Sequence, residues 1–374
     1  LHDEMTDGLK RRYKNLMRNI LRAGGNVGPD TYFTSYFDEF RKTIIWHEEM
    51  KTYWSEWVRS FERPWGPLYD EWSNRPTKKD HQRWSRPTGS VVKSYRDFAC
   101  YFAKKQLENG VGIYFDNTFL QPAYNLVTTT AYTRPDGTIQ PSAQIWARRK
   151  YLRRIWVLHK QLYQPETPQI MMLHMTNSHI LPYMVWNQAN LDLEWKVRGA
   201  RPFQEKFSPE LLRAESLGRK TGNYPMAMLN PRRPDHMSKE EFAFIQRTHR
   251  DALYVHEIKY SPNIRTAAAP EPLSDFGYGQ PDCRVINYWE PEAPISVSDD
   301  QCKWILLRRE GKALVMLVTW NDEEKEIKVK VDTDALGIDV DRVTNAESGE
   351  TTPAPDGDFA FTMPGYGTRI YRLQ

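Results

Sequence analysis

Residues 94–117 read SYRDFACYFAKKQLENGVGIYFDN, and this stretch decides the fold class. Its first part places apolar residues at helical spacing and stops at Asn109-Gly110, a pair that commonly ends a helix. The apolar run VGIYF follows and ends at Asp116. A short apolar run bounded by polar residues is typical of a strand buried on both faces in a parallel sheet. The stretch therefore predicts a helix that leads into a buried parallel strand.

The same alternation of helices and short apolar runs recurs along the chain. Further helices are predicted over 6–23, 142–163, 208–222 and 238–260, the last with a capping box formed by Ser238 and Glu241. Further buried strands are predicted at 169–177, 189–195, 225–229 and 283–289. This order favours an α/β fold, a (β/α)8-type barrel. About six strands are visible, so either the barrel is incomplete in this chain or residues 26–60 hold strands without a clear pattern.

The pattern changes after residue 295. WILLRREGKALVMLVTWN at 304–321 is predicted to form a hairpin around Gly311, and EIKVKVD at 326–332 alternates strictly between polar and apolar residues. Two more strands are predicted at 358–363 and 367–373. The sequence thus predicts two domains, a barrel over 1–295 and a small antiparallel β-sandwich over 296–374.

Composition narrows the possible partners. The net charge is only +4, with acidic and basic residues interspersed, so no nucleic-acid partner is predicted. The basic residues of 148–154 are interpreted as a solvated helix face. No uninterrupted apolar stretch is long enough for a membrane span. The three cysteines, Cys100, Cys283 and Cys302, lack the spacing of a metal site, and neither a metal nor a cofactor is predicted.

Aromatic residues make up 13% of the chain. They suit either a large aromatic core or a cleft in which aromatic rings stack on sugars. The candidate substrate-binding residues are polar or aromatic. They are Tyr114, Asn117, His174, Asn177, His179, Trp186, Asn187, Tyr288 and Trp289.

Carboxylates near strand ends are the candidate catalytic groups. Asp116 stands where barrel enzymes place active-site residues, and a carboxylate there can act as a nucleophile or stabilise an oxocarbenium-like transition state. The alternative is that Asp116 caps the following segment. In LDLEW, Asp192 and Glu194 share one strand face, and Glu194 is the preferred acid. The adjacent pair Asp70 and Glu71 lies in a long loop and is a further candidate.

Two parts of the chain resemble known glycosidases. The segments 315–338, 345–350 and 357–373 resemble the terminal β-sandwich of many barrel glycosidases, through a Trp-Asn strand end, a Leu-Gly turn, a Ser-Gly-Glu turn and a closing Pro-x-x-Gly-Thr-Arg strand. GVGIYFDNTF resembles the strand-end Asp motif of such barrels. Residues 94–296 are similar to bacterial proteins related to the β-N-acetylgalactosaminidase family.

The resemblance implies a glycoside hydrolase with a carbohydrate substrate, and it favours a secreted or periplasmic protein. The β-N-acetylgalactosaminidase family uses adjacent Asp and Glu residues and the acetamido group of the substrate, but Asn117 follows Asp116 here. The α-galactosidase and endo-α-N-acetylgalactosaminidase group uses a strand-end Asp with a separate acid, which fits Asp116 with Glu194. The alternatives are a non-catalytic carbohydrate-binding barrel and a subunit of a larger assembly.

Overall fold

The computed structural model describes residues 34–37, 42–44, 48–57, 85–87, 92–108, 112–116, 118–120, 122–163, 169–174, 178–193, 200–216, 222–227, 229, 233–260 and 269–374. The chain divides into two compact units, the first formed by 1–190 with 221–223 and the second by 191–220 with 224–374. The predicted helix 6–23 lies outside the described residues, and of the long loop predicted over 63–90 only residues 85–87 are described.

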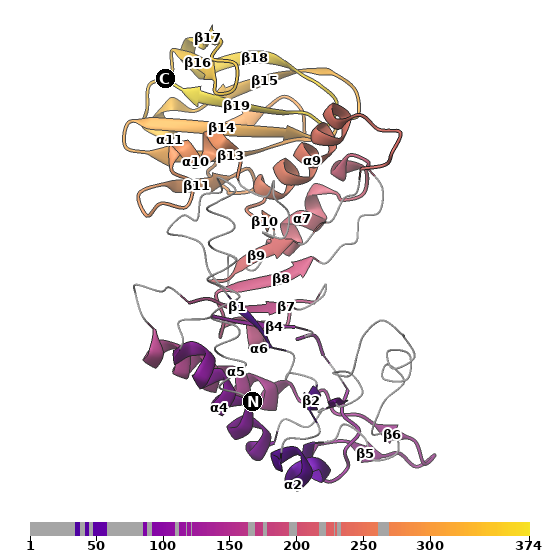
Figure 1. The fold of residues 1–374 in the computed structure, drawn as a ribbon. Helices are drawn as coiled ribbons and strands as arrows, with labels where there is room; N and C mark the ends of the chain where they lie inside the picture. Colours follow the sequence, from indigo (N-terminus) through magenta and orange to yellow (C-terminus); the bar gives the residue numbers. More distant parts are fainter. Residues whose placement is uncertain are drawn as a thin grey trace. The chain divides into compact units, whose positions relative to one another are not determined.

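The first unit is built on a parallel sheet in the order β1-β4-β7 (Figure 1). Its strands are β1 (Thr34–Phe37), β2 (Lys42–Ile44), β3 (Ser85–Pro87), β4 (Gly112–Phe115), β5 (Tyr132–Thr133), β6 (Ile139–Gln140) and β7 (Met171–His174). Its helices are α2 (Glu48–Trp57), α4 (Lys93–Glu108), α5 (Ile145–Leu162) and α6 (Leu181–Met184). Since α4 precedes β4 and α5 connects β4 to β7, this part has the predicted α/β order. Strand β8 (Ala189–Leu193) starts in the first unit and ends in the second.

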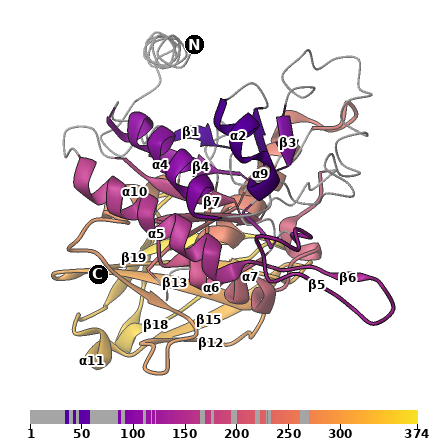
Figure 2. The same ribbon diagram turned by 90° about the horizontal axis from the view of Figure 1, so that it is seen from below.

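Helices α4 and α5 pack against each other and against the sheet (Figures 1 and 2). Phe98 and Leu107 of α4 and Ile155 of α5 share one buried cluster with Ile113 and Phe115 of β4. The side chains of Leu107, Ile155, Ile113 and Phe115 are fully buried. Gly112 is required at the start of β4, because a Cβ there would collide with the backbone of Ile170 on the neighbouring chain segment.

The second unit contains helices η1 (Phe203–Glu205), α7 (Pro209–Glu215), α9 (Lys239–Tyr254), α10 (Glu271–Phe276), α11 (Thr333–Leu336) and η2 (Pro355–Gly357). Its first strands, β9 (Tyr224–Ala227) and β10 (Lys259–Tyr260), pair in parallel. The predicted capping box of α9 is confirmed, since Ser238 accepts from the backbone of Glu241 and Glu241 accepts from the backbone of Ser238.

Two antiparallel sheets complete the second unit. One has the order β11-β13-β14-β19-β16-β17 and the other the order β12-β15-β18. The strands are β11 (Arg284–Asn287), β12 (Ile295–Val297), β13 (Cys302–Arg309), β14 (Lys312–Thr319), β15 (Lys325–Val331), β16 (Arg342–Asn345), β17 (Thr351–Pro353), β18 (Asp358–Met363) and β19 (Thr368–Leu373). The predicted hairpin around Gly311 is confirmed by the pairing of β13 with β14.

Strands β13 and β14 of the six-stranded sheet are buried on both faces. Leu306 and Val315 pack in a cluster with Val329 of the smaller sheet, which makes the sandwich. Leu314 and Met316 face the other way and pack in a cluster with residues of α9 and the segment after it. Antiparallel strands commonly have one face exposed to solvent. Here the face of β13 and β14 that points away from the smaller sheet is covered by α9 and the segment after it. This explains why β13 and β14 read as nearly continuous apolar runs and not as the alternating pattern expected of a hairpin.

One strand prediction is wrong. The apolar run at 283–289 was expected to be a buried strand of the parallel sheet, but β11 pairs antiparallel with β13, with Val285 opposite Leu307. A short apolar run does not distinguish a parallel strand from an antiparallel strand covered on both faces. Strand β11 of the sandwich therefore precedes the domain boundary that was predicted between residues 295 and 296. No helix in the described part of the chain is both long and apolar enough to cross a membrane.

The packing of β4 gives a first prediction about stability. Replacing Phe115 with Ala removes a fully buried ring and is expected to lower the free energy of unfolding of the first unit by about 3–5 kcal/mol. The control is Phe244→Ala, because Phe244 is 41% exposed and its loss should change stability by less than about 1 kcal/mol. Guanidinium denaturation followed by aromatic fluorescence measures both. Equal effects of the two substitutions would contradict the burial of β4.

Candidate active site

The candidate site lies where β4 and β7 end. Ile113 pairs with Met171, Tyr114 with Met172, and Phe115 with Leu173. The next residues along the two strands are Asp116 and His174. Because side chains alternate across a strand, Asp116 shares the face of Tyr114 and points away from the core occupied by Phe115. The register thus brings three predicted site residues together at the carboxyl end of a parallel strand pair.

Asp116, His174 and Tyr114 form one hydrogen-bonded group. His174 Nδ1 lies 2.9 Å from Asp116 Oδ1 and 2.5 Å from the Tyr114 hydroxyl, and the Tyr114 hydroxyl lies 3.3 Å from the same carboxylate oxygen. The side chains of His174 and Asp116 are only 5% and 13% exposed. These contacts link a nearly buried carboxylate to an imidazole and a phenolic hydroxyl.

The chemistry of the three groups assigns the protons. An ionised carboxylate can only accept hydrogen bonds, so the short contact to Asp116 requires the imidazole proton on Nδ1 of His174. The Tyr114 hydroxyl donates to the same oxygen, and the Nδ1 proton is shared between the carboxylate and phenolic oxygens. Two donors on Oδ1 stabilise the charged carboxylate and fix its orientation. This is the arrangement that a nucleophilic or charge-stabilising carboxylate needs.

Thr118 holds the two strand ends together, and the sequence analysis missed it. Its backbone N–H and its hydroxyl each donate to the carbonyl oxygen of His174, both at 2.8 Å, and its side chain is fully buried. The segment after β4 and the last residue of β7 are therefore fixed to each other. The only local signal was a hydroxyl side chain two positions after the strand-end carboxylate.

The loop after β4 is closed at its base. Ala123 and Ser142 exchange both backbone hydrogen bonds, each 2.9 Å long. The buried Asn125 accepts from the backbone N–H groups of Val127 and Thr128 and donates to a carbonyl of α2. The β5–β6 hairpin extends from this base (Figure 2).

Several predicted site residues cannot be placed. Asn117, Asn177, Glu194, Asp70 and Glu71 lie outside the described residues. Asp192 belongs to β8, as predicted, but only its backbone is described. The prediction that Asp192 and Glu194 share one face, and the choice of proton donor, stay predictions.

Three other predicted residues lie in the first unit. His179 is half-buried in the segment before α6. Trp186 packs on the first core cluster, and the guanidinium groups of Arg149 and Arg153 lie 5.1 and 5.8 Å from its ring centre. Asn187 is buried and donates to the carbonyl of Ala189 and to the side chain of Asn190.

Tyr288 and Trp289 belong to the second unit and surround a buried histidine. The Tyr288 hydroxyl lies 3.0 Å from His256 Nε2, and the Trp289 ring stacks on the imidazole with an interplanar angle of 15°. His256 Nδ1 lies 2.8 Å from the carbonyl of Ala252, and Trp320 meets the imidazole edge-on. These two aromatic residues thus enclose His256, which the sequence analysis did not single out.

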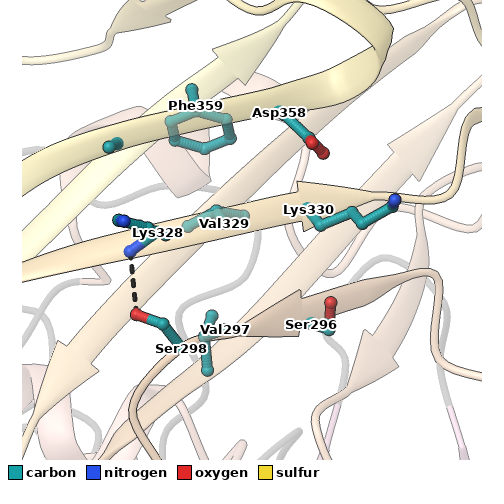
Figure 3. A pocket seen from close by; sticks show the side chains of 9 residues that line it. Ser296, Val297, Ser298, Lys328, Val329, Lys330, Asp358 and Phe359 are labelled. Atoms are coloured by element: carbon teal, nitrogen blue, oxygen red, sulfur yellow. Dashed lines mark hydrogen bonds between the residues drawn. The ribbon is translucent and has the colours of Figure 1, made fainter.

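A hollow of about 510 Å³ lies on the smaller sheet of the sandwich (Figure 3). Lys328, Lys330, Asp358 and Phe359 line it, and the Ser298 hydroxyl accepts from the backbone of Lys328. It contains one carboxylate and none of the predicted site residues. Among the described residues, no group of three or more His, Cys, Asp or Glu side chains is arranged to hold a metal ion.

Comparison with protein families gives one match in the second unit. Residues 274–348 match the C-terminal domain of glycoside hydrolase 123. This family-123 segment runs from α10 to β16 and therefore includes most of the six-stranded sheet. The match agrees with the predicted resemblance of the C-terminal region to glycosidase sandwiches. A search among proteins of curated function found no match.

Several solved structures similar in fold to this chain are glycosidases. The chain superposes on a maltogenic α-amylase from Thermotoga neapolitana with a TM-score of 0.53 at 10% identity, covering 92% of this chain and 78% of that one. A β-L-arabinopyranosidase of family GH27 from Geobacillus stearothermophilus gives 0.49 at 11% identity, with 75% and 62% covered. A putative α-N-acetylgalactosaminidase from Bacillus halodurans C-125 gives 0.42 at 10% identity, with 80% and 66% covered.

The amylase comparison supports the predicted architecture, a barrel-type α/β domain followed by an antiparallel β-sandwich. The chain spans 62% of the length of the arabinopyranosidase. At these identities the likeness concerns the fold alone.

The buried histidine of the second unit gives a prediction about pH. Burial lowers the pKa of His256 to about 4 from its usual 6.5. As the pH falls, His256 therefore takes up a proton in the unfolded chain at a higher pH than in the folded protein. The stability that the neutral imidazole provides is present above pH 6.5 and is lost as the pH falls toward 4. We expect the second unit to lose about 3 kcal/mol from this group over that range.

Denaturation at several pH values measures this loss. His256→Asn should flatten the dependence of unfolding free energy on pH, although the buried His249, whose pKa is also lowered to about 4, retains its own part. A slope equal to that of the unaltered protein would contradict the assignment of the proton to His256.

Proposed function

We propose that this protein hydrolyses glycosidic bonds, with Asp116 as the nucleophile or as the stabiliser of the positive charge that develops on the sugar. The supporting observation is the nearly buried Asp116 carboxylate, held at the end of a parallel strand by His174 and Tyr114. Active sites of barrel enzymes form at this end of the strands. The family-123 match and the barrel fold support the same activity.

The contacts of Asp116 suit this role. The His174 imidazole and the Tyr114 hydroxyl both lie within hydrogen-bond distance of one carboxylate oxygen. These contacts hold the carboxylate in one orientation, and its side chain is only 13% exposed. Capping of the following segment is the alternative role for Asp116.

A second carboxyl group must protonate the leaving oxygen. We propose Glu194 for this role, with Asp192 next and the pair Asp70 and Glu71 as further candidates. A separation of about 5–5.5 Å from Asp116 would give retention of configuration, and about 6.5–9.5 Å would give inversion. We propose that Asn117, Asn177 and His179 contact sugar hydroxyls.

Replacing Asp116 with Asn tests the activity directly. The substitution keeps the size of the side chain and removes its charge, so turnover of an aryl glycoside should fall on the order of 10³-fold. A panel of α- and β-aryl glycosides first identifies a cleaved substrate. The control is Asp235→Asn, because Asp235 is exposed and should leave turnover unchanged. Full activity of the Asp116 variant would remove it from the mechanism.

Tyr114→Phe tests the hydrogen-bonded group more finely. Loss of one hydrogen bond to a charged group costs about 1.5–3 kcal/mol, so kcat should fall about 10–100-fold. KM should change little if the hydroxyl acts on the carboxylate and not on the sugar. A rise in KM with unchanged kcat would instead place Tyr114 among the groups that bind substrate uniformly.

A non-catalytic carbohydrate-binding barrel remains the alternative. It predicts that the unaltered protein and the Asp116 variant bind the same glycan equally and that neither cleaves it.

A further inference from the structure

Helix α5 has an unusual charge composition. Its 18 residues include six Arg or Lys residues and no Asp or Glu. In the whole chain, 52 basic residues are nearly balanced by 48 acidic ones. The excess on α5 is therefore local, and the net charge of the protein does not reveal it.

The basic face of α5 meets α4 in a groove of about 800 Å³. Six of its lining side chains are basic and one is acidic: Lys93, Arg96, Lys104, Lys150, Arg153 and Arg154, with Asp97. Apolar and aromatic side chains complete the lining: Cys100, Tyr101, Val157 and Leu158. The groove lies entirely within the first unit.

The acidic residue of the groove is already bound. Asp97 pairs with Lys93 at 2.6 Å and with Arg154. The hydrogen bond from Lys93, followed by that from Arg154, lowers the pKa of the Asp97 carboxyl. Lys104 pairs with a second carboxylate of α4, Glu108. The lining still carries more positive than negative charge, and anionic groups from outside the chain would complement it.

The spacing along α5 adds a cost that an anion would relieve. Lys150 and Arg154 are four residues apart, as are Arg149 and Arg153, and like charges at this spacing repel each other on a helix. Lys150, Arg153 and Arg154 are exposed. Guanidinium groups bind sulfate and carboxylate groups through paired hydrogen bonds.

We propose that the α4–α5 groove binds an anionic glycan that carries sulfate or uronic acid groups. Its volume is in the range of sites that hold several sugar-sized groups. Tyr101 is 56% exposed in the groove, and the Lys105 ammonium lies over its ring, 4.7 Å from the ring centre. The exposed part of this ring offers an apolar surface to a sugar beside cations that pair with the acidic substituents. The choice of a glycan among anions rests on the proposed function.

Direct binding tests the groove without turnover. The probe is a sulfated heparin-derived hexasaccharide, measured by titration calorimetry at low and high salt. The unaltered protein should bind it, with affinity that falls as salt rises. Lys150→Glu combined with Arg153→Glu should weaken binding at least tenfold. If the charge-reversed variant folds poorly, Lys150→Gln combined with Arg153→Gln is the second variant, because it changes the charge less. It should also weaken binding.

The matched control places two equal charge reversals in the second unit. Lys239→Glu combined with Lys312→Glu changes the net charge by the same amount at exposed sites, and it should keep full affinity. Equal loss in the groove and control variants would show a response to net charge and overturn the proposal. Absence of binding, or equal groove-dependent affinity for a DNA duplex, would also overturn it.

Activity separates this proposal from the proposed function. Both groove variants should cleave a small aryl glycoside as fast as the unaltered protein. Groove-dependent binding in a protein that cleaves no glycoside supports the groove while the catalytic proposal fails. Cleavage without groove-dependent binding overturns the groove alone.

Discussion

In the first unit, β4 and β7 pair in the register that sets Phe115 beside Leu173, and the geometry of the candidate site follows from this pairing. A slip by one residue would turn Phe115 out of the core and Asp116 into it, because strand side chains alternate. Burying an unpaired carboxylate among apolar side chains is strongly unfavourable. The core that holds Ile113 and Phe115 therefore also fixes the distance between Asp116 and His174.

Much of this site was predictable, because it depends on local patterns. Asp116 and His174 each end a short apolar run, and parallel strands bring such ends to one edge of a sheet. The mutual contact of Tyr114, Asp116 and His174 was not predictable, because it depends on which strands are neighbours and in what register. No spacing within the sequence encodes that choice. The role of Thr118 depends on the same pairing and was missed for the same reason.

In the second unit, local patterns predicted the elements better than their partners. The capping box of α9 and the turn at Gly311 follow from a few adjacent residues. Strand β11 was assigned to the wrong sheet because its apolar run results from burial on both faces, which either kind of sheet can provide. Likewise, no residue close to Tyr288 and Trp289 in the sequence indicates that they enclose His256, which lies 32 positions before Tyr288 in the chain.

The closed base of the loop after β4 separates changes in the loop from changes in the contacts of Asp116 and His174. Thr118 fixes the strand ends on one side, and the Ala123–Ser142 bridge closes the loop on the other. Between Ala123 and Ser142 the chain leaves and returns at one point, so the length and composition of the β5–β6 hairpin can change without altering the distance between Asp116 and His174. In evolutionary terms, the hairpin is an exchangeable module, and it can vary while the contacts of Asp116 stay the same.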